Sequence, residues 1–108
     1  MPNYNIIISK PALDDLNGIY QYFAEQLLLP KTAAKTVKNI EDEINYYLSY
    51  MPHYPFADDG RLAQKGIRKM VVKKYLVLFI ILENERTVSV ERIIHGARRW
   101  ESIINNNN

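Results

Sequence analysis

The sequence predicts an α+β domain in which a two-helix hairpin packs on one face of a mainly antiparallel four-stranded sheet, in the order β-α-α-β-β-β. Two observations carry this prediction. The first half of the chain holds two long segments in which apolar residues recur every three or four positions, which is typical of amphipathic helices. The second half holds short apolar runs separated by turns, which is typical of strands. Helices and strands that are separated in this way favour a two-layer domain.

The first elements are a strand and a helix. Residues 4–8 are rich in isoleucine and predict a short strand. Ser9 is a suitable N-cap for a helix that begins near Pro11, because a proline fits a first turn whose N–H has no partner. The apolar stripe predicts that this helix covers residues 11–27, and Pro30 breaks the pattern.

A second helix is predicted over residues 31–50. The short connection makes the two helices an antiparallel hairpin. A loop should follow at residues 51–60, which contain two prolines, two aspartates and a glycine. The apolar stripe of the second helix consists of Ala33, Val37, Ile40, Ile44, Tyr47, Leu48 and Met51.

Three strands should complete the sheet, at residues 67–72, 75–82 and 87–94. Lys73-Lys74 forms a tight connection between the first two of them. The middle strand shows no polar alternation, so both of its faces should be covered. The N-terminal strand must pair beside a late strand, most simply this central one.

Length and composition indicate one cytoplasmic domain. The 108 residues fit a single domain at 1–104 with a disordered tail at 105–108. The absence of cysteine excludes disulfides and thiolate chemistry. We expect no signal peptide, and the longest apolar run is too short to span a bilayer. His53 and His95 have no companions at ligand spacing, so we expect neither a metal nor a cofactor.

Charge is unevenly distributed along the chain. Residues 1–59 hold four Lys/Arg and eight Asp/Glu, a net −4, whereas residues 60–108 hold ten and four, a net +6. Six of these cations and no carboxylate lie between Arg61 and Tyr75. One interpretation is a face that binds an anion. The other is two solvated sequence halves whose charges interleave once the chain has folded.

Several segments, in their order and spacing, resemble one known group of proteins. The resemblance covers nearly the whole chain and is to the RelE/ParE superfamily of toxins from bacterial type II toxin–antitoxin systems. The matching pieces are residues 9–16 (SKPALDDL), 19–26 (IYQYFAEQ), the helix 34–51 with Pro52 after it, 66–72 (GIRKMVV), 75–79 (YLVLF) and 90–98 (VERIIHGAR).

The chain is most similar to the ParE branch. The long hairpin over residues 11–51, the IYQYFAEQ run and the His-Gly-Ala-Arg ending are typical of that branch. Its members poison DNA gyrase, are not known as nucleases and are neutralised by a cognate antitoxin. The resemblance therefore implies a ParE-like toxin that is not an enzyme, with an antitoxin and DNA gyrase as partners.

Two alternatives remain open. The RelE branch consists of ribosome-dependent endoribonucleases that cut mRNA by attack of a 2′-OH, with the ribosome and mRNA as partners. Two departures count against it: Leu76 stands where nuclease members often carry arginine, and Trp100 where a tyrosine often helps the chemistry. A degenerate member that keeps the fold and antitoxin binding without toxicity is the other alternative. The positions that match parts of the nuclease set are Arg68, Arg92, His95 and Arg98.

The target-binding site is predicted at the basic positions near the strand ends. Arg68, Arg92 and Arg98 should converge on one face, where guanidinium groups hold phosphates or carboxylates by forked hydrogen bonds. Arg99 and Trp100 complete the predicted set. The competing interpretation is ion pairing of these arginines with Glu91, Glu101 or acids of the first half.

His95 also has two interpretations. Near a phosphate it could act as an acid or a base around neutral pH. We favour the structural one, a histidine at a strand end that caps the sheet through a backbone hydrogen bond, because Gly96 follows it.

Overall fold

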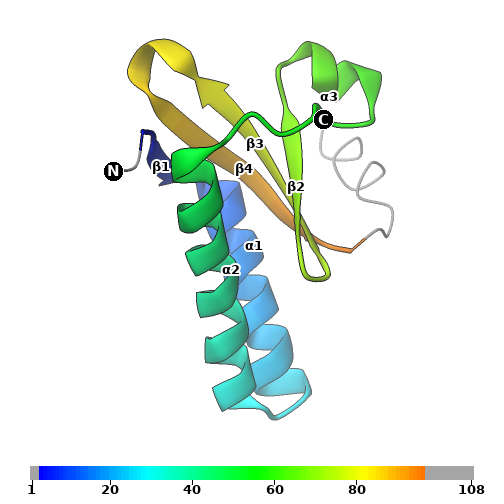
Figure 1. Ribbon diagram of the computed structural model, residues 1–108. Helices are drawn as coiled ribbons and strands as arrows, with labels where there is room; N and C mark the ends of the chain where they lie inside the picture. The colour runs from blue at the N-terminus through cyan, green and yellow to red at the C-terminus, as the bar shows by residue number, and fades with distance from the viewer. Residues whose placement is uncertain (1–2, 97–108) are drawn as a thin grey trace.

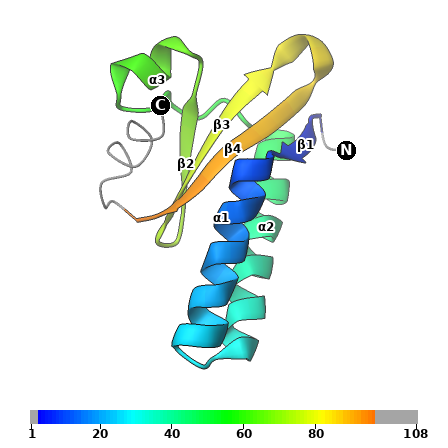
Figure 2. The same ribbon diagram turned by 180° about the vertical axis from the view of Figure 1, so that it is seen from behind.

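The computed structural model describes residues 3–96 (Figure 1). Two antiparallel helices cover one face of a four-stranded sheet, and Figures 1 and 2 show that their hairpin projects beyond the sheet. The predicted fold class and the order β-α-α-β-β-β are confirmed, with additional short helical segments. The elements are β1 (Asn5–Ile8), α1 (Lys10–Gln21), η1 (Tyr22–Gln26), α2 (Pro30–Tyr50), α3 (Gly60–Gln64), β2 (Arg68–Val72), β3 (Tyr75–Leu82), η2 (Glu83–Glu85) and β4 (Thr87–His95).

The sheet is mixed, with the strand order β1-β4-β3-β2. β2, β3 and β4 are antiparallel neighbours, whereas β1 runs parallel to β4, with Asn5 opposite Thr87 and Ile8 opposite Val90. The prediction that the first strand pairs with the central strand was wrong. β3 is already hydrogen-bonded on both sides by β2 and β4, so β1 can pair only at an outer edge of the sheet, and it pairs at the edge of β4.

The helical hairpin begins at the predicted cap. Ser9 has an extended backbone, and its side chain accepts a hydrogen bond from the Ala12 N–H. The predicted helix at 11–27 was wrong in its last turns: α1 ends at Gln21, and residues 22–26 form a π-helical turn. Leu28, at φ 57°, reverses the chain, and Pro30 opens α2 at a position that needs no N–H donor.

The main core lies between this hairpin and the sheet. Ile40, Ile44 and Leu48 recur every four residues on α2 and are fully buried. Tyr47 and Met51, which the predicted stripe included, are exposed. Met51 lies just after the last residue of α2 and has a non-helical backbone, with φ −140°. Core residues from the sheet include Phe79, Met70, Val77, Val88, Val90 and Ile93.

A smaller core covers the opposite face of the sheet. The loop predicted at 51–60 is followed by a short helix, α3, that the sequence analysis missed. Asp59 caps it by accepting hydrogen bonds from the N–H groups of Arg61 (2.8 Å) and Leu62. Leu62 then packs in a cluster with Leu76 and Leu78 of β3. The prediction that both faces of the middle strand are covered is therefore confirmed.

Glu83, at the start of η2, contacts two residues that are distant in the sequence. Tyr4 Oη donates a hydrogen bond to Glu83 Oε1 (2.9 Å), and His53 Nε2 lies 2.7 Å from Glu83 Oε2. Hydrogen bonding from His53 and then from Tyr4 lowers the pKa of Glu83 below its usual value. His53 is exposed, as predicted.

Burial predicts a large difference between two leucines of α1. Leu16 is 4% exposed and Leu13 is 46% exposed. Leu16→Ala should lower the free energy of unfolding by about 2–5 kcal/mol, because it leaves a cavity under the sheet. Leu13→Ala, the same change on the same helix, should cost under about 1 kcal/mol. Urea unfolding of both variants measures this, and equal losses would contradict the packing described for α1.

The Glu83 contacts predict a loss of stability in acid. A carboxylate whose folded-state pKa is lowered stabilises the fold above its unfolded pKa of about 4.3, and this contribution is lost as the pH falls through the folded value. The urea midpoint of the wild type should therefore exceed that of Glu83→Gln at about pH 6 and approach it below about pH 4. Glu85→Gln, on the same turn, is the control. A difference that is constant with pH would refute the role of the Glu83 charge.

Candidate functional site

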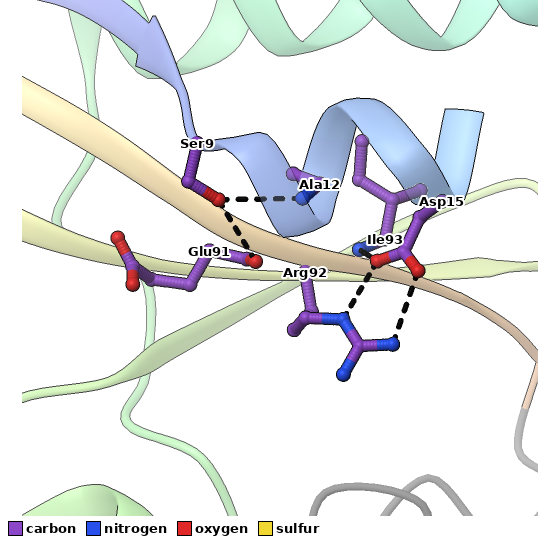
Figure 3. Close-up of polar contacts among 6 residues, drawn as sticks. All are labelled: Ser9, Ala12, Asp15, Glu91, Arg92 and Ile93. Atoms are coloured by element: carbon purple, nitrogen blue, oxygen red, sulfur yellow. Dashed lines mark hydrogen bonds and ion pairs between the residues drawn. The ribbon is translucent and has the colours of Figure 1, made fainter. Parts of the chain in front are cut away.

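The site begins where β1 stops pairing with β4. β1 pairs with β4 only as far as Val90, and the Ser9 N–H still donates to the Val90 carbonyl (2.9 Å). The register places Val90 opposite Phe79 and Arg92 opposite Leu78, so Glu91 is an extra residue in a β-bulge. Ser9 Oγ donates to the Glu91 carbonyl (3.1 Å), which brings the start of α1 against this bulge (Figure 3).

Beyond the bulge, β1 no longer pairs with β4, and the side chain of Asp15 from α1 contacts this edge of β4. Its Oδ2 accepts a hydrogen bond from the Ile93 N–H (2.8 Å) (Figure 3). A strand edge with no neighbour leaves backbone donors without partners, and a buried donor of this kind is costly. The Asp15 carboxylate therefore replaces the acceptor that a longer β1 would have supplied.

The same carboxylate holds Arg92 through a forked ion pair. Arg92 Nε donates to Asp15 Oδ2 (2.8 Å) and Arg92 Nη2 donates to Asp15 Oδ1 (3.0 Å). The two side chains are only 23% and 16% exposed. These hydrogen bonds raise the pKa of Arg92 above its ordinary value, so the guanidinium stays charged. The sequence left two interpretations of Arg92, target binding and an ion pair with an acid of the first half. The structure contains the ion pair, with Asp15.

Arg68 is engaged elsewhere. Its guanidinium donates to the Tyr54 carbonyl (2.6 Å) and lies 4.1 Å from the centre of the Phe56 ring. Arg68 is opposite Phe79 of β3, whereas Arg92 is opposite Leu78. Because successive residues of a strand face opposite sides of the sheet, the two arginines lie on opposite faces. The structure therefore does not bring Arg68 and Arg92 together.

His95 is exposed at the end of β4. Its ring meets Tyr75 edge to face, with the ring centres 5.5 Å apart. The backbone hydrogen bond at this strand end comes from Gly96, whose N–H donates to the Lys74 carbonyl. Gly96 has φ 56°, which favours glycine. The position at a strand end is as expected for His95, but its neighbour supplies the backbone bond.

The remaining predicted site residues, Arg98, Arg99 and Trp100, lie outside the described residues. Their placement beside Arg68 or Arg92 stays a prediction. Within residues 3–96, no group of three His, Cys, Asp or Glu side chains could hold a metal ion. In the same part of the chain, no helix is both long and apolar enough to cross a membrane.

The uneven charge of the sequence is partly resolved by pairing between its two halves. Asp15 pairs with Arg92, and Lys69 Nζ lies 2.7 Å from Asp58 Oδ1. These contacts agree with interleaved charges. Lys73 and Lys74 are exposed in the β2–β3 turn, and no described carboxylate lies within ion-pair distance of either.

Asp15 is the residue that sequence reasoning missed. A signal was present, because Ala12, Asp15 and Ile19 share one face of the helix at spacings of three and four. Ala12 is fully buried. A carboxylate on an apolar helix face requires a partner, and the edge of β4 supplies it.

The fold is that of a small α+β protein with a helical hairpin on one face of a four-stranded mixed sheet. The family model described as the ParE toxin of the type II toxin–antitoxin system parDE matches residues 6–100. The chain therefore belongs to the ParE toxin family. No curated protein matches the chain.

Three solved structures show the same fold. A chain from a chromosomal ParDE toxin–antitoxin system of P. aeruginosa has a TM-score of 0.71 at 17% identity, covering 87% of this chain and 97% of that one. A chain of the RelBE2 toxin–antitoxin complex of Mycobacterium tuberculosis has a TM-score of 0.59 at 21% identity, covering 90% and 95%. The isolated RelE toxin of E. coli has a TM-score of 0.51 at 11% identity, covering 96% of each chain.

The Asp15 contacts predict an order of stability among variants. Asp15→Ala should lower the free energy of unfolding by about 2–4 kcal/mol, because it leaves Arg92 and the Ile93 N–H without their acceptor. Asp15→Asn keeps an acceptor for Ile93 and should lose less. Asp14→Ala, which removes an exposed i,i+4 pair with Lys10, should change stability by under about 1 kcal/mol. Urea unfolding ranks the three, and a neutral Asp15→Ala would refute the role of Asp15.

Proposed function

We propose that this chain is a cytoplasmic toxin that inhibits DNA gyrase by binding and is neutralised by a cognate antitoxin. The observation that carries the choice of a binding protein over a nuclease is the Arg92–Asp15 pair. A nuclease needs its cations and bases free and gathered around one phosphate. Here Arg92 is engaged by Asp15, and Arg68 lies on the other face with its own partners.

Two features support an antitoxin as the partner. The relatives from P. aeruginosa and M. tuberculosis come from toxin–antitoxin systems. In addition, the end of α2 and the residue that follows it expose a set of large apolar side chains. Contiguous exposed apolar surface of this kind marks a protein interaction site. The set consists of Tyr46, Tyr47, Tyr50 and Met51.

For the target, we propose that Arg98, Arg99 and Trp100 provide the main contacts. Arginine and tryptophan dominate the binding energy of many protein interfaces. Arg68 and Arg92 would then contribute mainly through the fold, since each is held by a partner within the chain.

A RelE-type ribosome-dependent endoribonuclease is the second candidate. One observation favours it: His95 is exposed beside Tyr75 at the end of β4, in the chain segment that leads to Arg98. An exposed imidazole at such a position suits proton transfer. A degenerate member without toxicity is the third outcome that an experiment has to separate.

The proposal predicts different results in two assays of the purified chain. DNA supercoiling by gyrase should be inhibited, whereas mRNA on translating ribosomes should stay intact. Arg98→Ala and Arg99→Ala should each weaken inhibition by roughly ten- to a hundredfold, the loss of one charge-assisted contact. Lys38→Ala, an exposed cation on α2 that pairs with Asp42, is the matched control.

Three other outcomes would change the assignment. Cleaved mRNA with unaffected gyrase would establish the endoribonuclease. Activity in neither assay, with antitoxin binding retained, would indicate the degenerate member. Full inhibition by both arginine variants would place the target contacts elsewhere.

A further inference from the structure

The far end of the helical hairpin is a feature that the proposed function leaves unused. The turn between η1 and α2, cyan in Figures 1 and 2, lies at the end of the hairpin that projects beyond the sheet. It carries three consecutive leucines, Leu27, Leu28 and Leu29, and all of them are exposed. We call these three residues the leucine tip. Exposed apolar side chains that lie together mark an interaction site.

The backbone conformation of Leu28 is one that disfavours leucine. Its φ is 57°, in the left-handed region, where the backbone crowds a Cβ atom and where glycine or asparagine is the usual residue after a helix. Leu28 is also 75% exposed, so burial within the chain does not compensate for this strain. A strained residue that internal packing does not explain is a candidate for a functional contact.

Hydrogen bonds hold the tip in one conformation. Tyr22–Gln26 form a π-helical turn, a feature that is frequent at functional sites. After it, the Leu29 N–H donates to the Phe23 carbonyl (2.8 Å), and the Leu29 carbonyl accepts from the Ala33 N–H (2.9 Å). Because Leu29 is bonded to both η1 and α2, Leu28 is presented in a fixed position. A preorganised contact of this kind loses little conformational entropy on binding.

The size and charge of the tip argue against two classes of partner. A second copy of the chain presents the same convex end, and three leucines are a small part of the roughly 800 Å² per partner that a stable interface buries. An anionic membrane recruits clusters of about four or more cations. The charged residues nearest to the leucines in the sequence have both signs, namely Glu25, Lys31 and Lys35.

The projecting shape favours a folded protein as the partner. A segment that folds on binding lies along a groove or a strand edge, and it offers no pocket of its own. A convex apolar tip instead fits a pocket on the surface of a larger protein, where a few fully buried side chains supply most of the binding energy.

We propose that the leucine tip inserts into an apolar pocket of the folded target of this chain, which under the proposed function is DNA gyrase. This inference rests on the proposed function for the identity of the target. Leu28, the most exposed of the three leucines, enters the pocket, and Leu27 and Leu29 pack at its rim. The tip is then a second target contact besides the positions 98–100.

Three substitutions of Leu28 separate backbone strain from target contact. Leu28→Gly and Leu28→Asn suit a φ of 57° and remove the apolar side chain. Their urea midpoints should equal or exceed that of the wild type, whereas their inhibition of gyrase supercoiling should fall roughly tenfold or more. Leu28→Met keeps a flexible apolar side chain, so its inhibition should stay within about threefold of the wild type. Leu13→Ala, at an exposed leucine near the start of α1, is the control and should inhibit like the wild type.

Growth inhibition after induction is measured for the same variants, because it does not depend on which target the chain has. Loss of growth inhibition by a fully stable Leu28→Gly would support the tip as a target contact. Unchanged inhibition of both gyrase and growth by this variant would overturn the inference. Loss of antitoxin binding alone would also overturn it, because the tip would then contact the antitoxin. The same holds if the wild type, but not Leu28→Gly, sediments with vesicles of phosphatidylglycerol and phosphatidylcholine.

The two assays keep this inference apart from the proposed function. A wild type that inhibits growth but not gyrase would refute the proposed target, and the growth inhibition by Leu28→Gly would then decide whether the tip contacts another target. A wild type that inhibits gyrase equally with and without the Leu28 side chain would leave the proposed function standing and refute the tip. A wild type that inhibits neither gyrase nor growth would refute both.

Discussion

One carboxylate determines how the two layers of this protein meet. β4 is an inner strand where β1 pairs with it and an edge strand after Val90. Asp15 compensates for this change by accepting three hydrogen bonds, from the Ile93 N–H and from two nitrogens of Arg92. A largely buried charge is stable only if it is paired and hydrogen-bonded, so these contacts fix α1 against β4 in one position.

This constraint changes how the cationic positions are understood. A basic sequence half looks like a single binding surface, but folding separates its members. Arg92 is held at the β4 edge, Arg68 anchors the loop beside β2, and Lys69 pairs with Asp58. Of the cations between Arg61 and Tyr75, Lys65, Lys73 and Lys74 are exposed and have no ion-pair partner among the described residues. The formal charge of this half of the sequence therefore overstates the number of cations that could contact a partner.

The fold was predictable because its signals are local. Each of three signals identifies one element. Ser9 caps α1, buried residues recur every four positions on α2 (Ile40, Ile44 and Leu48), and β3 is a continuous apolar run. The pairing of β1 with β4 was missed because sequence spacing does not say which edge of a sheet is free. The Asp15–Arg92 pair was missed for a related reason: 77 residues separate its members, and only the completed sheet brings them together.

The central claim is that Arg92 is held by Asp15 and is not free to contact a target. The side-chain Nε–H signal of Arg92 in an ¹H–¹⁵N NMR spectrum tests it most directly. In the wild type this proton should exchange slowly with water, and in Asp15→Ala it should exchange as fast as that of Arg61, whose side chain is 67% exposed. A rapidly exchanging Arg92 Nε–H in the wild type would contradict the account.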